Sequence, residues 1–181
     1  MMCKKVEILL GYAKKMLSLY TKLHNMPDNE SNIPYMRTDT VLSLPAEVRA
    51  DAWAVDAACS GNPGPMEYKA VDLQTGYQVF HFGPIHGTNN IGEFLAIVHA
   101  LALAWQKGLH TKTIYSDSYN AILWVQNGKC KTKLERSPQT DYIFQLITRA
   151  EYWLQTHRWR NPLIKWETQQ WGEIPADFGR K

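Results

Sequence analysis

The sequence predicts an α/β fold in which helices cover a mixed β-sheet. Two observations carry this prediction. Three strand-like segments come first and are separated only by tight turns, and helical and strand-like patterns then alternate to the end of the chain. The chain has 181 residues, of which 45% are hydrophobic and 12% aromatic, and this suits one ordinary domain with its own core.

Residues 1–50 differ in pattern from the rest. Apolar side chains recur at helical spacing over residues 4–24, which predicts an amphipathic helix. We favour a helix docked on the main domain or on a second copy, while an arm that binds another protein or nucleic acid stays open. Residues 25–50 are polar and proline-punctuated, which is typical of a linker. The organised domain is therefore predicted over residues 51–181.

The predicted strands lie between turn signals. An apolar run starting at Ala52 ends in a glycine- and proline-rich turn at residues 60–65, and a second tight turn lies at residues 74–76. The five predicted strands cover residues 52–58, 66–72, 76–82, 113–116 and 163–167.

Three helices are predicted from apolar stripes at helical spacing. The first ends at Gly108, and Ser118 is suited to cap the second. An irregular tail is expected after the last strand. The predicted helices cover residues 91–107, 118–126 and 139–156.

Four carboxylates stand at element ends, where functional sites of open sheets gather: Asp56, Glu93, Asp117 and Asp177. If the first and fourth strands are neighbours, Asp56 and Asp117 converge, and the other two can reach in from flanking elements. Four clustered acids repel one another unless divalent cations neutralise them. Oxygen ligands suit Mg²⁺ or Mn²⁺ rather than zinc.

Each acid also has an ordinary structural explanation. Asp56 can bond its own turn, Asn90 and Glu93 can form a capping box, and Asp117 can favour a helix start. Asp177 can be a solvated tail residue. Spacing alone leaves both interpretations open.

Composition narrows the class of protein. A formal charge of +3 and an isoelectric point near 8.7 permit a polyanionic partner without requiring one. Three scattered cysteines without a CxxC pair suggest neither a disulfide framework nor a zinc site, and favour a reducing, cytoplasmic setting. No apolar run approaches the roughly 20 residues of a membrane span. The start of the chain lacks the pattern of a signal peptide, so no export is expected.

Four short segments belong together: residues 56–65 (DAACSGNPGP), 88–96 (TNNIGEFLA), 116–118 (SDS) and 173–177 (EIPAD). In sequence, order and placement they resemble type 1 ribonuclease H. The resemblance covers about residues 51–181. It implies a mixed five-stranded sheet with helices on both faces. It also implies endonucleolytic cleavage of the RNA strand of RNA–DNA hybrids.

The resemblance places the family's four metal ligands on Asp56, Glu93, Asp117 and Asp177. It implies hydrolysis assisted by two Mg²⁺ ions, with Mn²⁺ as a possible substitute, leaving 5′-phosphate and 3′-hydroxyl ends. Asp56 would bridge both ions. Glu93 would face the attacked strand and the leaving group.

The resemblance also implies the substrate contacts. Asn62 and Asn89 would read the minor groove and the 2′-hydroxyl, with help from the backbones of Cys59 and Gly61. Thr88 would hold a phosphate of the DNA strand. Residues 129–136, which include Lys129, Lys131 and Lys133, lie where relatives often carry a basic protrusion, so we favour phosphate contact over a merely solvated loop.

Two features depart from the family pattern. The segment 166–172 contains no histidine, whereas family members commonly place one there to assist proton transfer. The sequence also stops four residues after Asp177, which predicts a loosely held fourth ligand.

Two other functions stay open. One is a non-catalytic module that binds hybrids, although four acids facing a polyanion count against it. The other is a different nuclease of the same superfold, against which the segments 61–65 and 88–90 favour hybrid recognition.

Overall fold

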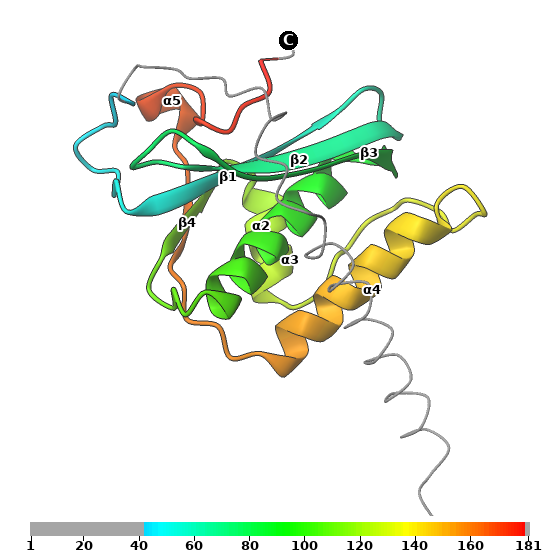
Figure 1. The fold of residues 1–181 in the computed structure, drawn as a ribbon. Helices are drawn as coiled ribbons and strands as arrows, with labels where there is room; N and C mark the ends of the chain where they lie inside the picture. Colours follow the sequence, from blue (N-terminus) through cyan, green and yellow to red (C-terminus); the bar gives the residue numbers. More distant parts are fainter. Residues whose placement is uncertain (1–41, 180–181) are drawn as a thin grey trace, which may run out of the picture. The chain divides into compact units, whose positions relative to one another are not determined.

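The described part of the chain is built on one five-stranded sheet (Figure 1). The computed structural model describes residues 42–179, and the predicted helix at residues 4–24 lies outside the described residues. The sheet order is β3-β2-β1-β4-β5. The β1–β2 and β2–β3 pairs are antiparallel, whereas β1–β4 and β4–β5 are parallel, which confirms the predicted mixed sheet. The strands are β1 (Ala52–Cys59), β2 (Gly64–Asp72), β3 (Gln78–Gly87), β4 (Thr113–Ser116) and β5 (Leu163–Lys165).

Strand β1 is the centre of the sheet and is buried on both faces. Its alternate side chains point to opposite sides, so Trp53 and Val55 enter a larger core while Ala52 and Ala54 enter a smaller one. The apolar run that begins β1 reflects this double burial.

Helices lie on both faces, as predicted. Helices α2 (Asn89–Gln106), α3 (Tyr119–Gln126) and α4 (Asp141–Thr156) cover one face and fill the larger core. Helix α5 (Thr168–Trp171) lies on the other side of the sheet, where Trp171 packs against the smaller core. The tail was expected to be irregular, and α5 corrects this: its single turn closes when Trp171 N donates to the carbonyl of Glu167 (2.8 Å).

The β2–β3 hairpin is longer than predicted. Pairing continues as far as Gly64 opposite Gly87, whereas β3 was expected to end at Phe82. Gly83 and Pro84 interrupt the strand pattern in the sequence, but an edge strand tolerates proline, and the register shifts between Met66 and Tyr68.

The folded part also includes the end of the segment interpreted as a linker. Leu42 and Leu44 pack against the smaller core, and Val48 is buried in it. None of the helices described for residues 42–179 combines the length and the apolar character that a membrane crossing requires.

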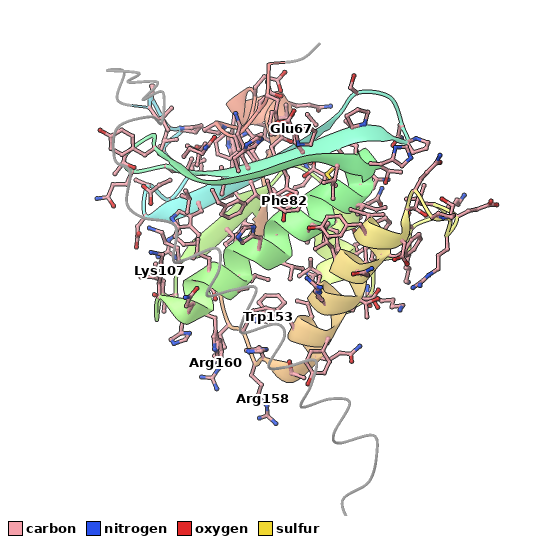
Figure 2. All side chains as sticks on the ribbon, turned by 45° about the vertical axis from the view of Figure 1, so that its right-hand side comes forward. Glu67, Phe82, Lys107, Trp153, Arg158 and Arg160 are labelled. Atoms are coloured by element: carbon pink, nitrogen blue, oxygen red, sulfur yellow. The ribbon has the colours of Figure 1, made fainter. Side chains whose placement is uncertain are left out.

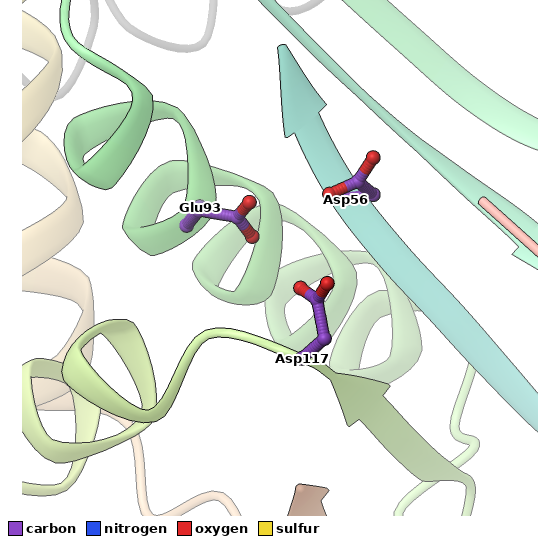
Figure 3. A group of neighbouring side chains, drawn as sticks. All are labelled: Asp56, Glu93 and Asp117. Carbon is purple, nitrogen blue, oxygen red and sulfur yellow. The ribbon is translucent and has the colours of Figure 1, made fainter. Parts of the chain in front are cut away.

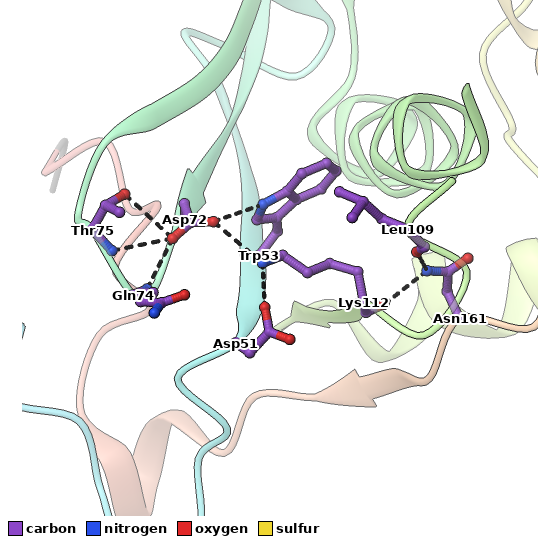
Figure 4. A network of polar contacts seen from close by, with 8 residues as sticks. All are labelled: Asp51, Trp53, Asp72, Gln74, Thr75, Leu109, Lys112 and Asn161. Carbon is purple, nitrogen blue, oxygen red and sulfur yellow. Dashed lines mark hydrogen bonds and ion pairs between the residues drawn. The ribbon is translucent and has the colours of Figure 1, made fainter. Parts of the chain in front are cut away.

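An ion-pair network joins the start of β1 to the end of β2 (Figure 4). Lys112 Nζ lies 2.5 Å from Asp51 Oδ1 and 3.4 Å from Asp72 Oδ2. Trp53 Nε1 donates to Asp72 Oδ2 (3.0 Å), and Asn161 Nδ2 donates to the carbonyl of Lys112 (2.8 Å). The network therefore connects β1, β2 and the residue before β4 at the end of the sheet where β1 begins.

Candidate active site

Three of the four predicted acids converge where β4 ends beside the second half of β1 (Figure 3). Val55 and Ser116 are register partners in these parallel strands, so the residues that follow them, Asp56 and Asp117, emerge side by side. Glu93 approaches from α2. One carboxylate oxygen from each of the three residues lies within 4.8 Å of the other two.

Glu93 reaches this position because α2 lies unusually close to the sheet. A Cβ atom on Gly92 would stand 2.8 Å from Ala57 Cβ and 2.7 Å from Met66 Sδ, so only glycine fits at this contact. Glu93 itself is buried. Its Oε1 accepts hydrogen bonds from Ala57 N (3.3 Å) and Asn89 Nδ2 (3.5 Å).

The start of α2 differs from the capping-box alternative. The helix begins at Asn89, and the hydroxyl of Thr88, rather than the side chain of Asn90, accepts from the backbone N–H of Ile91 (3.4 Å). Glu93 therefore lies in the second turn and faces the other acids. Its carboxylate does not cap the helix.

Burial and mutual repulsion make these acids hard to ionise together. Burial, with the negative charge of Asp117, raises the pKa of Asp56 to about 7. Burial, with the charges of Asp56 and Asp117, raises the pKa of Glu93 well above its ordinary range. Burial also raises the pKa of Asp117, although the Lys165 ammonium acts in the opposite direction.

The three acids fit a hard divalent cation. Glu93 Oε2 is buried and has no hydrogen-bond partner among the described residues, a costly arrangement that a bound cation would relieve. Carboxylate oxygens are the donors that Mg²⁺ and Mn²⁺ prefer. A positive charge between the acids would also remove the repulsion that raises the pKa of each one.

Asp177 lies near this group but is not one of the three converging acids. Its negative charge contributes to raising the pKa of both Asp56 and Asp117. Its Oδ2 accepts a hydrogen bond from the backbone N–H of Gly179 (2.7 Å). Its role as a fourth ligand stays a prediction.

The residues expected to recognise the substrate lie in two adjoining segments, the β1–β2 turn with the end of β1 and the start of α2. Asn62, in the β1–β2 turn, accepts a hydrogen bond from the backbone N–H of Asn89 (3.3 Å). In the same turn Gly61 adopts a φ of +89°, which favours glycine. Cys59 Sγ donates to the carbonyl of Gly87 (3.6 Å), the residue before Thr88. The two segments are therefore joined, with Glu93 directly beside Asn89.

The basic loop at residues 129–136 connects α3 to α4. Lys129 is paired with Glu151 (2.6 Å), and the other oxygen of Glu151 accepts from the backbone of Cys130 (3.0 Å). Glu151 thus fixes the start of the loop and neutralises one of its lysines. Lys131 and Lys133 are exposed to solvent.

Two cations beside the acids were not singled out from the sequence. Lys165 is the register partner of Ser116, the residue before Asp117, and Lys69 is the register partner of Asp56. Pairing of the strands is the signal that reveals both, and it depends on long-range contacts. Neither lysine has a distinctive local pattern.

Parts of the chain are similar to known proteins. A family model described as reverse transcriptase-like matches residues 76–162. The ribonuclease H of Neorickettsia sennetsu is 38% identical over 78 residues, which cover 40% of this chain and 51% of that protein. Over part of its length, the chain is therefore similar to a ribonuclease H.

Solved ribonucleases H were also found to be similar. The N-terminal RNase H domain of Rv2228c from Mycobacterium tuberculosis has a TM-score of 0.43 at 17% identity, covering 66% of this chain and 89% of that one. Ribonuclease H1 of Halobacterium salinarum has a TM-score of 0.39 at 22% identity, covering 66% of this chain and 88% of that one. A ribonuclease H1 named LC11, solved in complex with an RNA/DNA hybrid, has a TM-score of 0.39 at 19% identity, covering 66% of this chain and 86% of that one.

The chain spans about half the length of the curated ribonuclease H that it matches. This partial similarity leaves the activity, the substrate and the partners of this protein to be tested.

Proposed function

We propose that the protein is an endoribonuclease that cleaves the RNA strand of RNA–DNA hybrids. The observation that carries the proposal is the convergence of three buried carboxylates, one of them with an unpartnered oxygen. The ribonuclease H relative and the two joined segments beside Glu93 support the same activity.

Asp56, Glu93 and Asp117 would hold two Mg²⁺ ions, with Asp177 completing the ligand set and Mn²⁺ as a possible substitute. When bound, the ions supply an acidified water and stabilise negative charge on the phosphate and the leaving oxygen, so that 5′-phosphate and 3′-hydroxyl ends result. The acids of the chain would bind and orient the ions. The β1–β2 turn and the start of α2 would present the substrate to them.

Selection of a hybrid would come from the segments next to Glu93. The amides of Asn62 and Asn89 can donate and accept at short reach, which suits recognition of the 2′-hydroxyl and base edges in a minor groove. The backbones of Cys59 and Gly61 would contribute further hydrogen bonds. Thr88, the N-cap residue of α2, would contact a phosphate of the DNA strand.

The basic loop would add sequence-independent contact with phosphates. Lys131 and Lys133 are exposed and would make this contact directly. Lys129 would do so only by sharing or leaving its pairing with Glu151.

We also propose a cytoplasmic setting, and a protein partner or a second copy for the predicted helix at residues 4–24.

The test is cleavage of four labelled nucleic acids by the full chain: the RNA–DNA hybrid, double-stranded RNA, double-stranded DNA and single-stranded RNA. Each is incubated with Mg²⁺, Mn²⁺ or EDTA, alongside Asp56→Asn. We expect internal cuts in the RNA strand of the hybrid alone, abolished by EDTA and by the substitution. Tight hybrid binding without cuts would instead establish a non-catalytic binding module, and cuts in another duplex a different nuclease of this fold.

A further inference from the structure

The chain after α5 turns back across the smaller core and brings Asp177 toward the acids. Ile174 and Ala176 are buried in that core. The backbone N–H of Asp177 donates to the carbonyl of Ile174 (2.8 Å), which closes a turn. Burial therefore fixes the segment up to Ala176, and the position of Asp177 depends on what holds the next residues.

Lys69 contacts both of the next residues. Its Nζ donates to the backbone carbonyl of Asp177 (3.2 Å) and lies 4.5 Å from the centroid of the Phe178 ring. In the sheet Lys69 stands directly opposite Asp56 on β1 and His81 on β3. The Lys69 side chain thus joins β2, the strand paired with the one that carries Asp56, to the segment that carries Asp177.

A second pair of residues supports Phe178 from the β2–β3 hairpin. His81 Nε2 lies 2.6 Å from Glu67 Oε2, and the His81 ring lies 6.1 Å from the Phe178 ring, centroid to centroid. Glu67 and Phe82 lie on opposite faces of this hairpin (Figure 2). The contacts of the Phe178 ring with Lys69 and His81 put it on the same side as the Glu67–His81 pair. Phe178 is therefore held between Lys69 and His81.

We propose that Lys69 is a positioning residue that fixes the backbone of Asp177, so that the carboxylate of Asp177 completes the cation site formed by Asp56, Glu93 and Asp117. This inference rests on the proposed function. Lys69 contacts the carbonyl of Asp177 and the neighbouring ring, so it does not occupy the Asp177 carboxylate, of which Oδ2 accepts from Gly179 N–H.

The sign of the effect separates positioning from simple electrostatics. An ammonium beside a cation site repels a divalent ion, so removing a lysine that acts only through its charge would tighten metal binding. Removing a lysine that positions a ligand weakens it, by about 10-fold for typical supporting partners of metal ligands. The two roles therefore predict opposite changes in affinity.

The experiment compares the full chain with Lys69→Met, which keeps the stem and removes the charge, and Lys69→Arg, which keeps a cation. Lys107→Met is the control for loss of one lysine, because Lys107 is exposed and follows the far end of α2 (Figure 2). Mn²⁺ affinity is measured by titration calorimetry without substrate. Amide hydrogen exchange over residues 174–179 and thermal unfolding are measured on the same samples.

We expect Lys69→Met to weaken Mn²⁺ binding about 10-fold and to accelerate exchange after Ala176, while its melting temperature stays within a few degrees of the wild type. Lys69→Arg should recover most of the affinity, and Lys107→Met should match the wild type. Unchanged or tighter Mn²⁺ binding in Lys69→Met, or unchanged exchange of the tail, would overturn the inference. A wild type that binds Mn²⁺ but cuts no hybrid would overturn the proposed activity alone, because the comparison of affinities stands without it.

Discussion

Single residues at the acid cluster work against the stability of the fold. Asp56 and Glu93 are almost fully buried and stand beside Asp117, so ionising all three raises the free energy of the folded state. The sequence predicted that Asp56 and Asp117 could meet if the first and fourth strands were neighbours, and the pairing of β1 with β4 meets this condition. The extent of their burial follows from the close approach of α2 and had no signal in the sequence.

Asp56→Asn should stabilise the metal-free protein at neutral pH. The pKa of Asp56 is raised from 3.8 to about 7, so between these values the folded state binds more protons than the unfolded state, and stability falls as pH rises. A pKa raised by about three units corresponds to a loss of at most about 4 kcal/mol in the free energy of unfolding. Asp56→Asn should recover part of this loss. Urea unfolding in EDTA at pH 4.5 and pH 7.5 measures this.

The exposed Glu47 gives the matched control, since Glu47→Gln removes a carboxylate far less buried than Asp56. The free energies of unfolding of Asp56→Asn and the wild type should differ more at pH 7.5 than at pH 4.5. Glu47→Gln should differ little from the wild type at either pH. An Asp56→Asn protein that is less stable than the wild type at pH 7.5 would contradict the repulsion described here.

Gly92→Ala should damage both the fold and the site. The added methyl group would meet Ala57 Cβ at 2.8 Å, and Ala57 is held in the central strand, so α2 must move away from β1 and carry Glu93 with it. We expect a loss of about 1–3 kcal/mol in the free energy of unfolding and weaker Mn²⁺ binding. Asn90→Ala, at an exposed position on the same helix, is the control. Unaltered Mn²⁺ affinity in Gly92→Ala would show that Glu93 does not depend on this contact.

At the scale of elements, strand pairing decides what the site contains. The predicted strands and helices were found close to their expected bounds, because apolar periodicity and turn residues are local signals. The lengthened β3, the single turn of α5 and the cap at Thr88 were not predicted, since each depends on a contact with a distant or adjoining element. The pairing of β1 with β2 is also what places Lys69 opposite Asp56.

Lys112→Met should lower the stability of the fold, because Lys112 links the ends of β1, β2 and β4. Burial alone lowers the pKa of Lys112, but its hydrogen bond with Asp51 and the charge of Asp72 outweigh burial and raise it, so the lysine is charged in the fold. Since Asp51 is largely exposed, we expect a modest loss of about 1–2 kcal/mol, measured by urea unfolding at pH 7. Lys107→Met, which removes an exposed lysine just after α2, should change little. Equal stability of the two variants would show that the network contributes nothing measurable.

At the scale of the whole molecule, cation binding and folding are coupled through the acids. A divalent ion that binds only the folded state stabilises it by mass action, by roughly 1.4 kcal/mol at ten times the dissociation constant. We therefore expect Mg²⁺ or Mn²⁺ to raise the melting temperature of the wild type relative to EDTA. Asp56→Asn should show a much smaller rise, and an equal rise in both proteins would place the bound ions elsewhere.

The sequence by itself determined the order and type of the five strands and of helices α2 to α4, the turn between β1 and β2, and the four acids as candidates for one site. These follow from periodicity, turn chemistry and short motifs, which act over a few residues. Only the tertiary structure decided that Glu151 neutralises Lys129, that Gly92 admits Glu93 to the site, and that Lys69 contacts the tail at Asp177. Each of these joins residues from different elements. Such contacts depend on strand register and helix packing, which no local pattern specifies.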